Sequence, residues 1–300
     1  MTRPVSFSTI AAVMLVSSAA APVTPSGLYR VWVSGHGTDG ASCGSPTSPC
    51  RTLQYAHDNI VLASGEIDIL DPAGYGAVTI TKALSIVNDG VGTAGVQQAN
   101  ASSAAITINA GASDAIYLRG LNIDGLGTGQ DGIVFNSGGS LTVTNCVVRH
   151  FAQTGILVQT HNGTSLLSIS NTIASDNAVN GIDITPSKNG SVKGTITGVD
   201  ASRNAASYGI WVSGDSTSGT ATFVMVSDSN LSSNGTGIAA AGAGVRFGIT
   251  RVIVTNNSVD GVGTFNGTSG VPTAYTWGDN RVSGNTRLDI NGNLTAVSGK

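Results

Sequence analysis

Charged and aromatic residues are scarce in this 300-residue chain, at 10% and 5% of its positions. The formal net charge is only −3, and no run of Lys or Arg is present. The sequence therefore lacks the basic surface that nucleic-acid binding requires, and we expect no nucleic-acid partner. Strong helix formers are also sparse through the middle of the chain, which disfavours a helical domain.

Long apolar runs are missing too, apart from a short one at the start of the chain. Residues 1–20 have the pattern of a secretory signal peptide: Arg3 is the positive start, residues 7–16 are apolar, and residues 18–20 are small. A short membrane anchor is the less favoured alternative, because the run is about half the ~20 residues that a spanning helix needs. We expect a mature chain that begins near Ala21, has no membrane span, and is secreted to a periplasmic or extracellular location.

Cysteine is rare, with three residues in the whole chain. Cys43 and Cys50 flank a loop of Gly, Pro, Ser and Thr, and a local disulfide there would fix a segment that has no strong structure of its own. A metal site is the weaker interpretation, because no further Cys or His stands at ligand spacing, and we predict no metal. Cys146 occupies a strand position where other repeats carry small residues, so we expect it to pack inward rather than act as a nucleophile.

What the sequence does contain is a repeat. A Gly-Ile or Gly-Val pair opens a short apolar phrase six times, and successive glycines are 23, 26, 28, 28 and 24 residues apart. A period in this range is typical of a solenoid, and a continuous solenoid indicates one domain. The six glycines are Gly132, Gly155, Gly181, Gly209, Gly237 and Gly261.

A second phrase lies between the copies, and its apolar and small polar residues alternate as in a strand with one buried face. Its fifth position is Asn145, Asn171, Gly198, Asp228 or Asn256, residue types that tolerate left-handed backbone in turns. A further ladder follows at Asn177, Asn204 and Asn234, whose side chains can bond to one another from coil to coil. The economical model is all-β: a single-stranded parallel β-helix solenoid, with ladders such as Ile133, Ile156, Ile182, Ile210 and Ile238 filling its interior.

The two ends of the chain differ from the repeat. We expect residues 21–63 to form an N-terminal cap that contains the disulfide loop and a short amphipathic α-helix over 51–62, because a solenoid's terminal coil needs covering. The parallel β-helix would span 64–290, with residues 88–104 as a projecting loop and 291–300 as a C-terminal tail.

The remaining distinctive stretches are Val31-Trp32-Val33-Ser34, Pro49-Cys50-Arg51-Thr52-Leu53-Gln54, Gly65-Glu66-Ile67-Asp68-Ile69-Leu70 and the Asn-Gly-Ile repeats. Together they resemble secreted bacterial right-handed parallel β-helix proteins of the pectin-lyase-like superfamily. The resemblance implies the right-handed fold over most of residues 29–290. It does not fix an activity, because the superfamily includes lyases, hydrolases, epimerases, tailspikes and adhesins.

No complete catalytic motif is present, so whether the chain is an enzyme stays open. Polygalacturonase-like hydrolases pair Asp-Asp with Gly-His-Gly and Arg-x-Lys; here Gly35-His36-Gly37 stands alone, upstream of the cap helix, and is interpreted as a turn. The Asp-Pro-His-Asp of epimerase-like members is also missing. His57, His150 and His161 show no carboxylate or hydroxyl partner at a diagnostic spacing.

Resemblance to pectate lyases raises the alternative of calcium-assisted lyase chemistry. Asp183, Asp200 and Asp215 lie on adjoining turns of the repeat and could supply calcium ligands. Lys188, Lys193 and Arg203 follow nearby as candidate bases. Such residues are more often solvated positions on the outside of a coil.

A binding surface is the leading hypothesis. Strand alternation places Val134, Leu157, Asp183, Trp211 and Ala239 in one exposed row, with Asp183 and Trp211 one coil apart. A Trp ring beside a carboxylate, with Tyr208 close by, suits a sugar, although a lone surface aromatic is the plain alternative. We therefore expect a polysaccharide or cell-surface glycan partner, with a polysaccharide lyase or glycoside hydrolase, or a structural adhesion protein, as alternatives.

Overall fold

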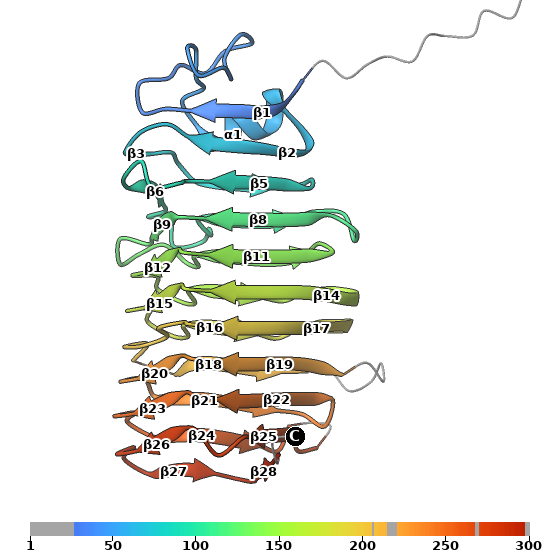
Figure 1. The fold of residues 1–300 in the computed structure, drawn as a ribbon, viewed down its shortest axis with the longest axis vertical. Helices are drawn as coiled ribbons and strands as arrows, with labels where there is room; N and C mark the ends of the chain where they lie inside the picture. Colours follow the sequence, from blue (N-terminus) through green and yellow to red (C-terminus); the bar gives the residue numbers. More distant parts are fainter. Residues whose placement is uncertain (1–26, 206, 215–220, 268–269, 298–300) are drawn as a thin grey trace, which may run out of the picture.

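The computed structural model describes residues 27–205, 207–214, 221–267 and 270–297 (Figure 1). The predicted signal peptide, its cleavage position near Ala21, and Asp215 lie outside this part of the chain. The described chain winds into one elongated solenoid whose coils stack along a single axis, with the N-terminal cap at one end (Figure 1).

Each coil contributes strands to sheets that run the length of the solenoid, and neighbouring strands pair in parallel. The eleven-stranded sheet contains β1 (Leu28–Val33), β2 (Val61–Ile69), β5 (Leu84–Val87), β8 (Ala115–Arg119), β11 (Ser140–Thr144), β14 (His161–Ser170), β17 (Ser187–Thr197), β19 (Thr222–Ser227), β22 (Val245–Thr250), β25 (Thr273–Thr276) and β28 (Leu294–Ala296).

Opposite it, the nine-stranded sheet contains β4 (Val78–Ile80), β7 (Ile106–Asn109), β10 (Ile133–Ser137), β13 (Ile156–Val158), β16 (Ile182–Ile184), β18 (Tyr208–Ser213), β21 (Thr236–Ala241), β24 (Asp260–Phe265) and β27 (Leu288–Asn291). Two smaller corner sheets complete the coils. They are formed by β3 (Ala73–Gly74), β6 (Ala94–Gln97), β9 (Leu121–Asp124), β12 (Val147–Arg149) and β15 (Ile173–Ser175), and by β20 (Asn230–Ser232), β23 (Ile253–Thr255) and β26 (Arg281–Ser283).

The core is a set of side-chain ladders, as the repeat predicts. Ile133, Ile156, Ile182, Ile210 and Ile238 pair in register along the nine-stranded sheet, and every one is fully buried. Each such side chain contributes roughly 1.5–3 kcal/mol by leaving water. Because equivalent positions stack directly, one apolar residue per coil suffices to build a continuous core.

The predicted asparagine ladder is present and longer than expected. The Asn204 side chain donates to the Ala174 carbonyl at 3.0 Å and to Asn234 at 3.1 Å, and it accepts from the Asn177 backbone at 3.1 Å. Asn257 and Asn285 continue the ladder toward the C-terminus. These bonds satisfy buried amides that would otherwise cost stability.

This ladder explains why glycine recurs before each isoleucine. A Cβ atom added to Gly181 would lie 2.7 Å from the Asn204 amide nitrogen and 2.7 Å from the Gly209 carbonyl oxygen. Gly209 has the same environment against Asn234. The asparagine of one coil can therefore pack here only because the residue beside it in the neighbouring coil is glycine.

The predicted turn residues have left-handed backbone. Asn145, Asn171, Asp228 and Asn256 have φ between 47° and 56°, and Gly198 has φ of 65°. Asn, Asp and Gly enter this region at the least cost, which explains their use at the corner of each coil.

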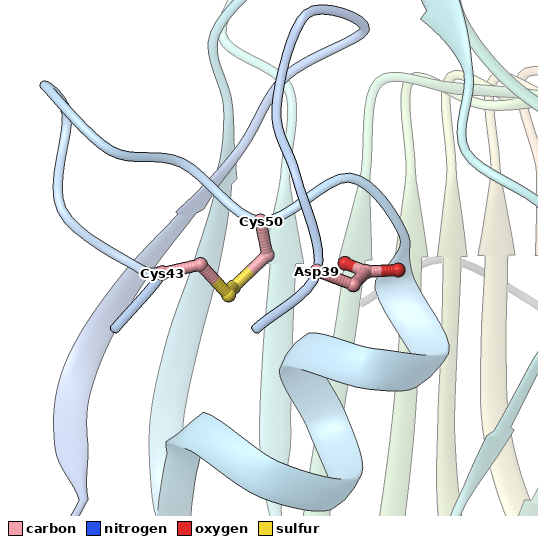
Figure 2. A group of neighbouring side chains, drawn as sticks. All are labelled: Asp39, Cys43 and Cys50. Atoms are coloured by element: carbon pink, nitrogen blue, oxygen red, sulfur yellow. A yellow bond between two sulfur atoms is a disulfide. The ribbon is translucent and has the colours of Figure 1, made fainter. Parts of the chain in front are cut away.

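The cap is built around the Cys43–Cys50 disulfide, which is confirmed (Figure 2). The helix is shorter than predicted: α1 (Leu53–Tyr55) passes into a wider turn, η1 (Ala56–Ile60). Asp39 fixes its start by accepting from the Arg51 and Thr52 backbones at 2.8 and 3.1 Å. Both Cys sulfurs are in the disulfide, so the nearby Asp39 does not share a thiolate metal site with them (Figure 2).

Two predicted boundaries are wrong. Residues 88–104 are not one loop, because β6 runs through them with Ala94 and Val96 fully buried. Small inward residues suit this tight corner, so the strand carries no strong apolar rhythm. The predicted tail also contains β28, which pairs with β25 and extends the eleven-stranded sheet. Among the described residues, no helix has both the length and the apolar character of a membrane span.

Candidate functional site

A hollow lies on the outer face of the nine-stranded sheet, over β4, β7, β10 and β13. It encloses about 560 Å³, and residues of the loop 98–104 and of α1 line it together with the strands. The loop is anchored because the Gln130 backbone donates to the carbonyls of Asn100 and Ser103 at 3.3 and 3.2 Å. We call this hollow the amide groove; its polar lining includes Gln54, Thr79, Gln98, Ser102, Ser103, Thr107, Gln130, Asp131, Asn136 and Gln159.

Side-chain amides run along the floor of the groove from coil to coil. Gln159 donates to Asn136 at 2.8 Å, and Asn136 donates to Asn109 at 2.8 Å. Each amide uses only part of its bonding capacity in this chain, so the Gln159 carbonyl oxygen and further amide N–H groups are left for other partners. The surface therefore offers donors and acceptors side by side.

Asp183 lies immediately beyond the groove. In β16, Asp183 pairs with the groove residue Leu157 of β13 on one side and with Trp211 of β18 on the other. Asn180 donates to its Oδ2 atom at 2.8 Å, whereas its Oδ1 atom is buried without a hydrogen-bond partner among the described residues. The predicted exposed position is thus wrong: neighbouring side chains cover Asp183 to more than half.

Burial raises the pKa of Asp183 to about 6, and the charge of Asp131 pushes in the same direction against the bond from Asn180. Asp131 lies two residues before β10 and is itself buried, and it accepts from the Thr154 backbone at 2.9 Å. Burial raises the pKa of Asp131 too. Two carboxyl groups with raised pKa on one grooved face are typical of functional sites.

An aromatic cluster continues the face beyond Asp183. The Trp211 ring centroid lies 4.5 Å from that of Tyr208 and 6.3 Å from that of Phe265. All three rings are half-buried. Phe265 lies over Gly263, where an added Cβ would be 2.7 Å from the ring.

This cluster corrects the predicted exposed row. Ala239 is fully buried and Val134 is 8% exposed, so neither belongs to an exposed row. Leu157, Asp183 and Trp211 keep partial exposure. The pairing of Asp183 with Trp211, one coil apart, is confirmed.

The predicted lyase cluster does not form among the described residues. Asp183 is on the nine-stranded sheet, whereas Asp200 bridges Ile173 and Asn230 in the corner sheets and accepts from the Asn230 amide at 3.1 Å. Lys193 belongs to β17 in the eleven-stranded sheet, and Arg203 pairs with Asp176 at 2.7 Å. The side chain of Lys188 lies outside the described part of the chain.

Two histidines have carboxylate partners that the sequence did not reveal. His150 approaches both oxygens of Asp124 at 3.2 Å, and this Asp is 26 residues earlier, one coil away. His57 Nδ1 lies 2.6 Å from Asp58, and its Nε2 accepts from the Thr81 backbone at 3.1 Å, which ties the cap to the first coil. Burial lowers the pKa of His57. His161 contacts the carbonyl of Gln159 at 3.4 Å.

Sequence reasoning missed the amide groove. Asn136 and Gln159 occupy the same outward position of consecutive repeats, two residues after Val134 and Leu157. A register alignment of the repeats would have shown two amides stacked on one face. Asp131 likewise opens its repeat in the place that Asn180 and Tyr208 hold in later ones.

Comparisons with known proteins agree with this architecture. Residues 78–224 match the family model described as a right handed beta helix region, which confirms the predicted handedness. A search of curated protein sequences finds no match.

Two solved structures are similar. The structure of the pectate lyase Pel9A has 16% identity and a TM-score of 0.64, covering 91% of this chain and 80% of that one. The pectin methylesterase PemA from Erwinia chrysanthemi has 13% identity and a TM-score of 0.44, covering 87% of this chain and 93% of that one. The likeness to the pectate lyase structure concerns the fold alone.

Proposed function

We propose that this right-handed parallel β-helix protein, with the pectin-lyase-like fold, binds an extended polysaccharide along the outer face of its nine-stranded sheet. One observation carries the proposal. The amide groove, Asp183 and the aromatic cluster form one uninterrupted path, because Leu157, Asp183 and Trp211 pair directly in consecutive strands.

The dimensions and chemistry of this path support an elongated ligand. From β4 to β18 there are five strand intervals, or about 24 Å at ~4.8 Å each, which suits several linked sugars better than one. Amides can bond sugar hydroxyls, and the exposed part of the aromatic cluster can contact the apolar face of a sugar ring. A concave site with a few placed polar groups is the usual form of a binding pocket.

Affinity electrophoresis against a panel of soluble polysaccharides tests the proposal. Retardation of the wild-type protein, weakened at least tenfold in Trp211→Ala, would support it. Trp277→Ala is the matched control, because Trp277 is 39% exposed and follows β25 of the eleven-stranded sheet. Equal losses in both variants, or no retardation by any polysaccharide, would contradict the proposal and favour a structural or adhesive role.

Hydrolysis of glycosidic bonds is a second candidate, favoured by the carboxyl groups of Asp131 and Asp183. Glycosidases need a protonated carboxyl as acid and a second carboxylate, and a pKa of about 6 keeps Asp183 partly protonated near neutrality. New reducing ends that disappear in Asp183→Asn would support this activity. Binding without new reducing ends would limit the protein to recognition.

We also propose that the protein works outside the cytoplasm. The signal-like segment 1–20 and the Cys43–Cys50 disulfide support this location, because structural disulfides persist in oxidising compartments. Expression of the full chain in a bacterial host, followed by fractionation and mass measurement, tests it. A processed chain outside the cytoplasm, beginning near Ala21, is the expected result; a full-length cytoplasmic chain would contradict it.

A further inference from the structure

We infer that the polysaccharide recognised by this face is uncharged, a neutral glycan rather than a polyuronide. This inference rests on the proposed function, because it names the class of ligand for the same surface. It is carried by the charges that the structure places along the face and by the amides that replace cations there.

The charges on the face have one sign. Of the fifteen residues that line the amide groove, Asp131 is the single charged one, and none is Lys, Arg or His. Asp183 adds a second carboxyl group one strand beyond the groove. A polyuronide laid along this path would bring its own carboxylates against both.

Two cations that adjoin strands of the nine-stranded sheet in the sequence are already engaged. Lys82, just after β4, donates to the carbonyl oxygens of His57 and Val61 at 2.6 and 2.7 Å. Arg287, before the last strand of the sheet, pairs with the buried carboxylate of Asp260. Neither is free to neutralise a ligand carboxylate without breaking bonds inside the protein.

Like charges brought together in a partly desolvated site cost binding free energy and act against the wrong partner. Asp183 makes this cost large, because its Oδ1 atom is buried and has no hydrogen-bond partner among the described residues. A sugar hydroxyl can donate to the part of the Asp183 carboxylate that solvent reaches, whereas a ligand carboxylate has no proton to donate. A ligand carboxylate placed against Asp183 is therefore unfavourable, and a hydroxyl is not.

Amide side chains along the face provide groups that can bind a neutral sugar. The Gln159–Asn136–Asn109 chain presents amide groups at successive coils, with bonds of 2.8 Å that fix their orientation. Gln130, whose side chain makes no hydrogen bond within the described part of the chain, adds a further amide to the lining. Sugar hydroxyls both donate and accept, so they complement amides without needing a counter-charge.

A matched pair of ligands provides the test: polygalacturonate and its fully methyl-esterified form, which share a backbone and differ in charge. Neutral β-glucan, galactomannan and arabinoxylan extend the panel. Affinity electrophoresis at pH 8 compares them, with calcium and with chelator. We expect at least tenfold tighter binding of one or more neutral glycans than of polygalacturonate, with no gain for polygalacturonate from calcium.

Two variants test the effect of the Asp183 charge separately from any effect on folding. Asp183→Asn should reduce the ratio of the affinity for neutral glycan to the affinity for polygalacturonate at least threefold. Asp89→Asn removes one negative charge from the loop after β5, where Asp89 pairs with Arg119, and should leave the discrimination unchanged. Circular dichroism establishes that both variants fold.

The outcomes distinguish the two proposals. Binding of polygalacturonate as tight as that of the neutral glycans, or tighter in the presence of calcium, would overturn the neutral-ligand inference while leaving polysaccharide binding in place. Absence of binding to every glycan would overturn both.

Discussion

The carboxylate of Asp183 lies beside Trp211, its direct partner in the next strand, and one of its oxygens is buried without a hydrogen-bond partner among the described residues. A largely covered carboxylate with an unpaired oxygen is costly to the fold, and groups with such costs cluster at functional sites. Asp183 therefore lowers the stability of the solenoid at the same place where we propose that the ligand binds.

The first prediction concerns pH and Asp183. Its pKa of about 6 in the folded protein exceeds the 3.8 of an unperturbed aspartate, so the folded state binds more protons between these two pH values. The free energy of unfolding contributed by this group therefore falls as pH rises through that window and stays low above it. At pH 8, Asp183→Asn should be more stable than wild type by up to about 3 kcal/mol.

Urea denaturation of both proteins from pH 4 to pH 8 measures this effect. The difference between them isolates Asp183, because other titrating groups such as Asp176 and Asp260 are common to both. A stability difference that does not change across this pH range would contradict the account of Asp183.

The asparagine ladder supplies the second prediction. Asn204→Ala removes bonds to Ala174, Asn234 and Asn177 and leaves their buried partners unsatisfied. Each unsatisfied buried group costs about 1–3 kcal/mol, so the variant should lose roughly 3 kcal/mol or more. Asn122→Ala, at a half-exposed position of β9, is the control and should change stability by less than about 1 kcal/mol. Equal effects in thermal unfolding would argue against a structural ladder.

A third prediction concerns the cap. The Cys43–Cys50 disulfide closes a loop with a sequence separation of 7, and the loop-closure relation gives about 2.5 kcal/mol for it. Replacing both cysteines by serine should lower stability by that amount and expose residues 36–52 to proteases first. Unchanged stability, with unchanged cleavage rates in this segment, would show that the cap does not depend on the disulfide.

The fourth prediction concerns the free thiol. Cys146 is buried, and burial raises the pKa of its thiol to about 11. Iodoacetamide at pH 8 should therefore not modify the folded protein, and modification should follow unfolding in urea, as mass spectrometry can show. Rapid modification of the native protein would contradict the buried position.

The fold could be predicted from the sequence because the same residue pattern occurs in coil after coil. Five isoleucines at a nearly constant period indicate one ladder, and Asn145 and its equivalents indicate one turn. Such signals add up over coils, so errors at a single position matter little. Where the pattern is interrupted, as at β6 with its small buried residues, the sequence misled.

The site was harder to predict, since it depends on which side chains cover which. Alternation correctly places Asp183 outward, but alternation does not reveal that Tyr208, Trp211 and Asn180 would enclose it. His150 and Asp124 are 26 residues apart, and their contact depends on the length of the coil between them. Pairing between coils requires an exact register, which variable coil lengths obscure.

Hydroxyl-radical footprinting with a bound neutral polysaccharide tests the central claim most directly. If the outer face of the nine-stranded sheet is the binding surface, Leu157, Tyr208 and Trp211 should become protected at saturation. Tyr117 and Met225, on the eleven-stranded sheet, should react as before. Protection of Tyr117 and Met225 instead, with Trp211 unchanged, would place the ligand on another face and contradict the account.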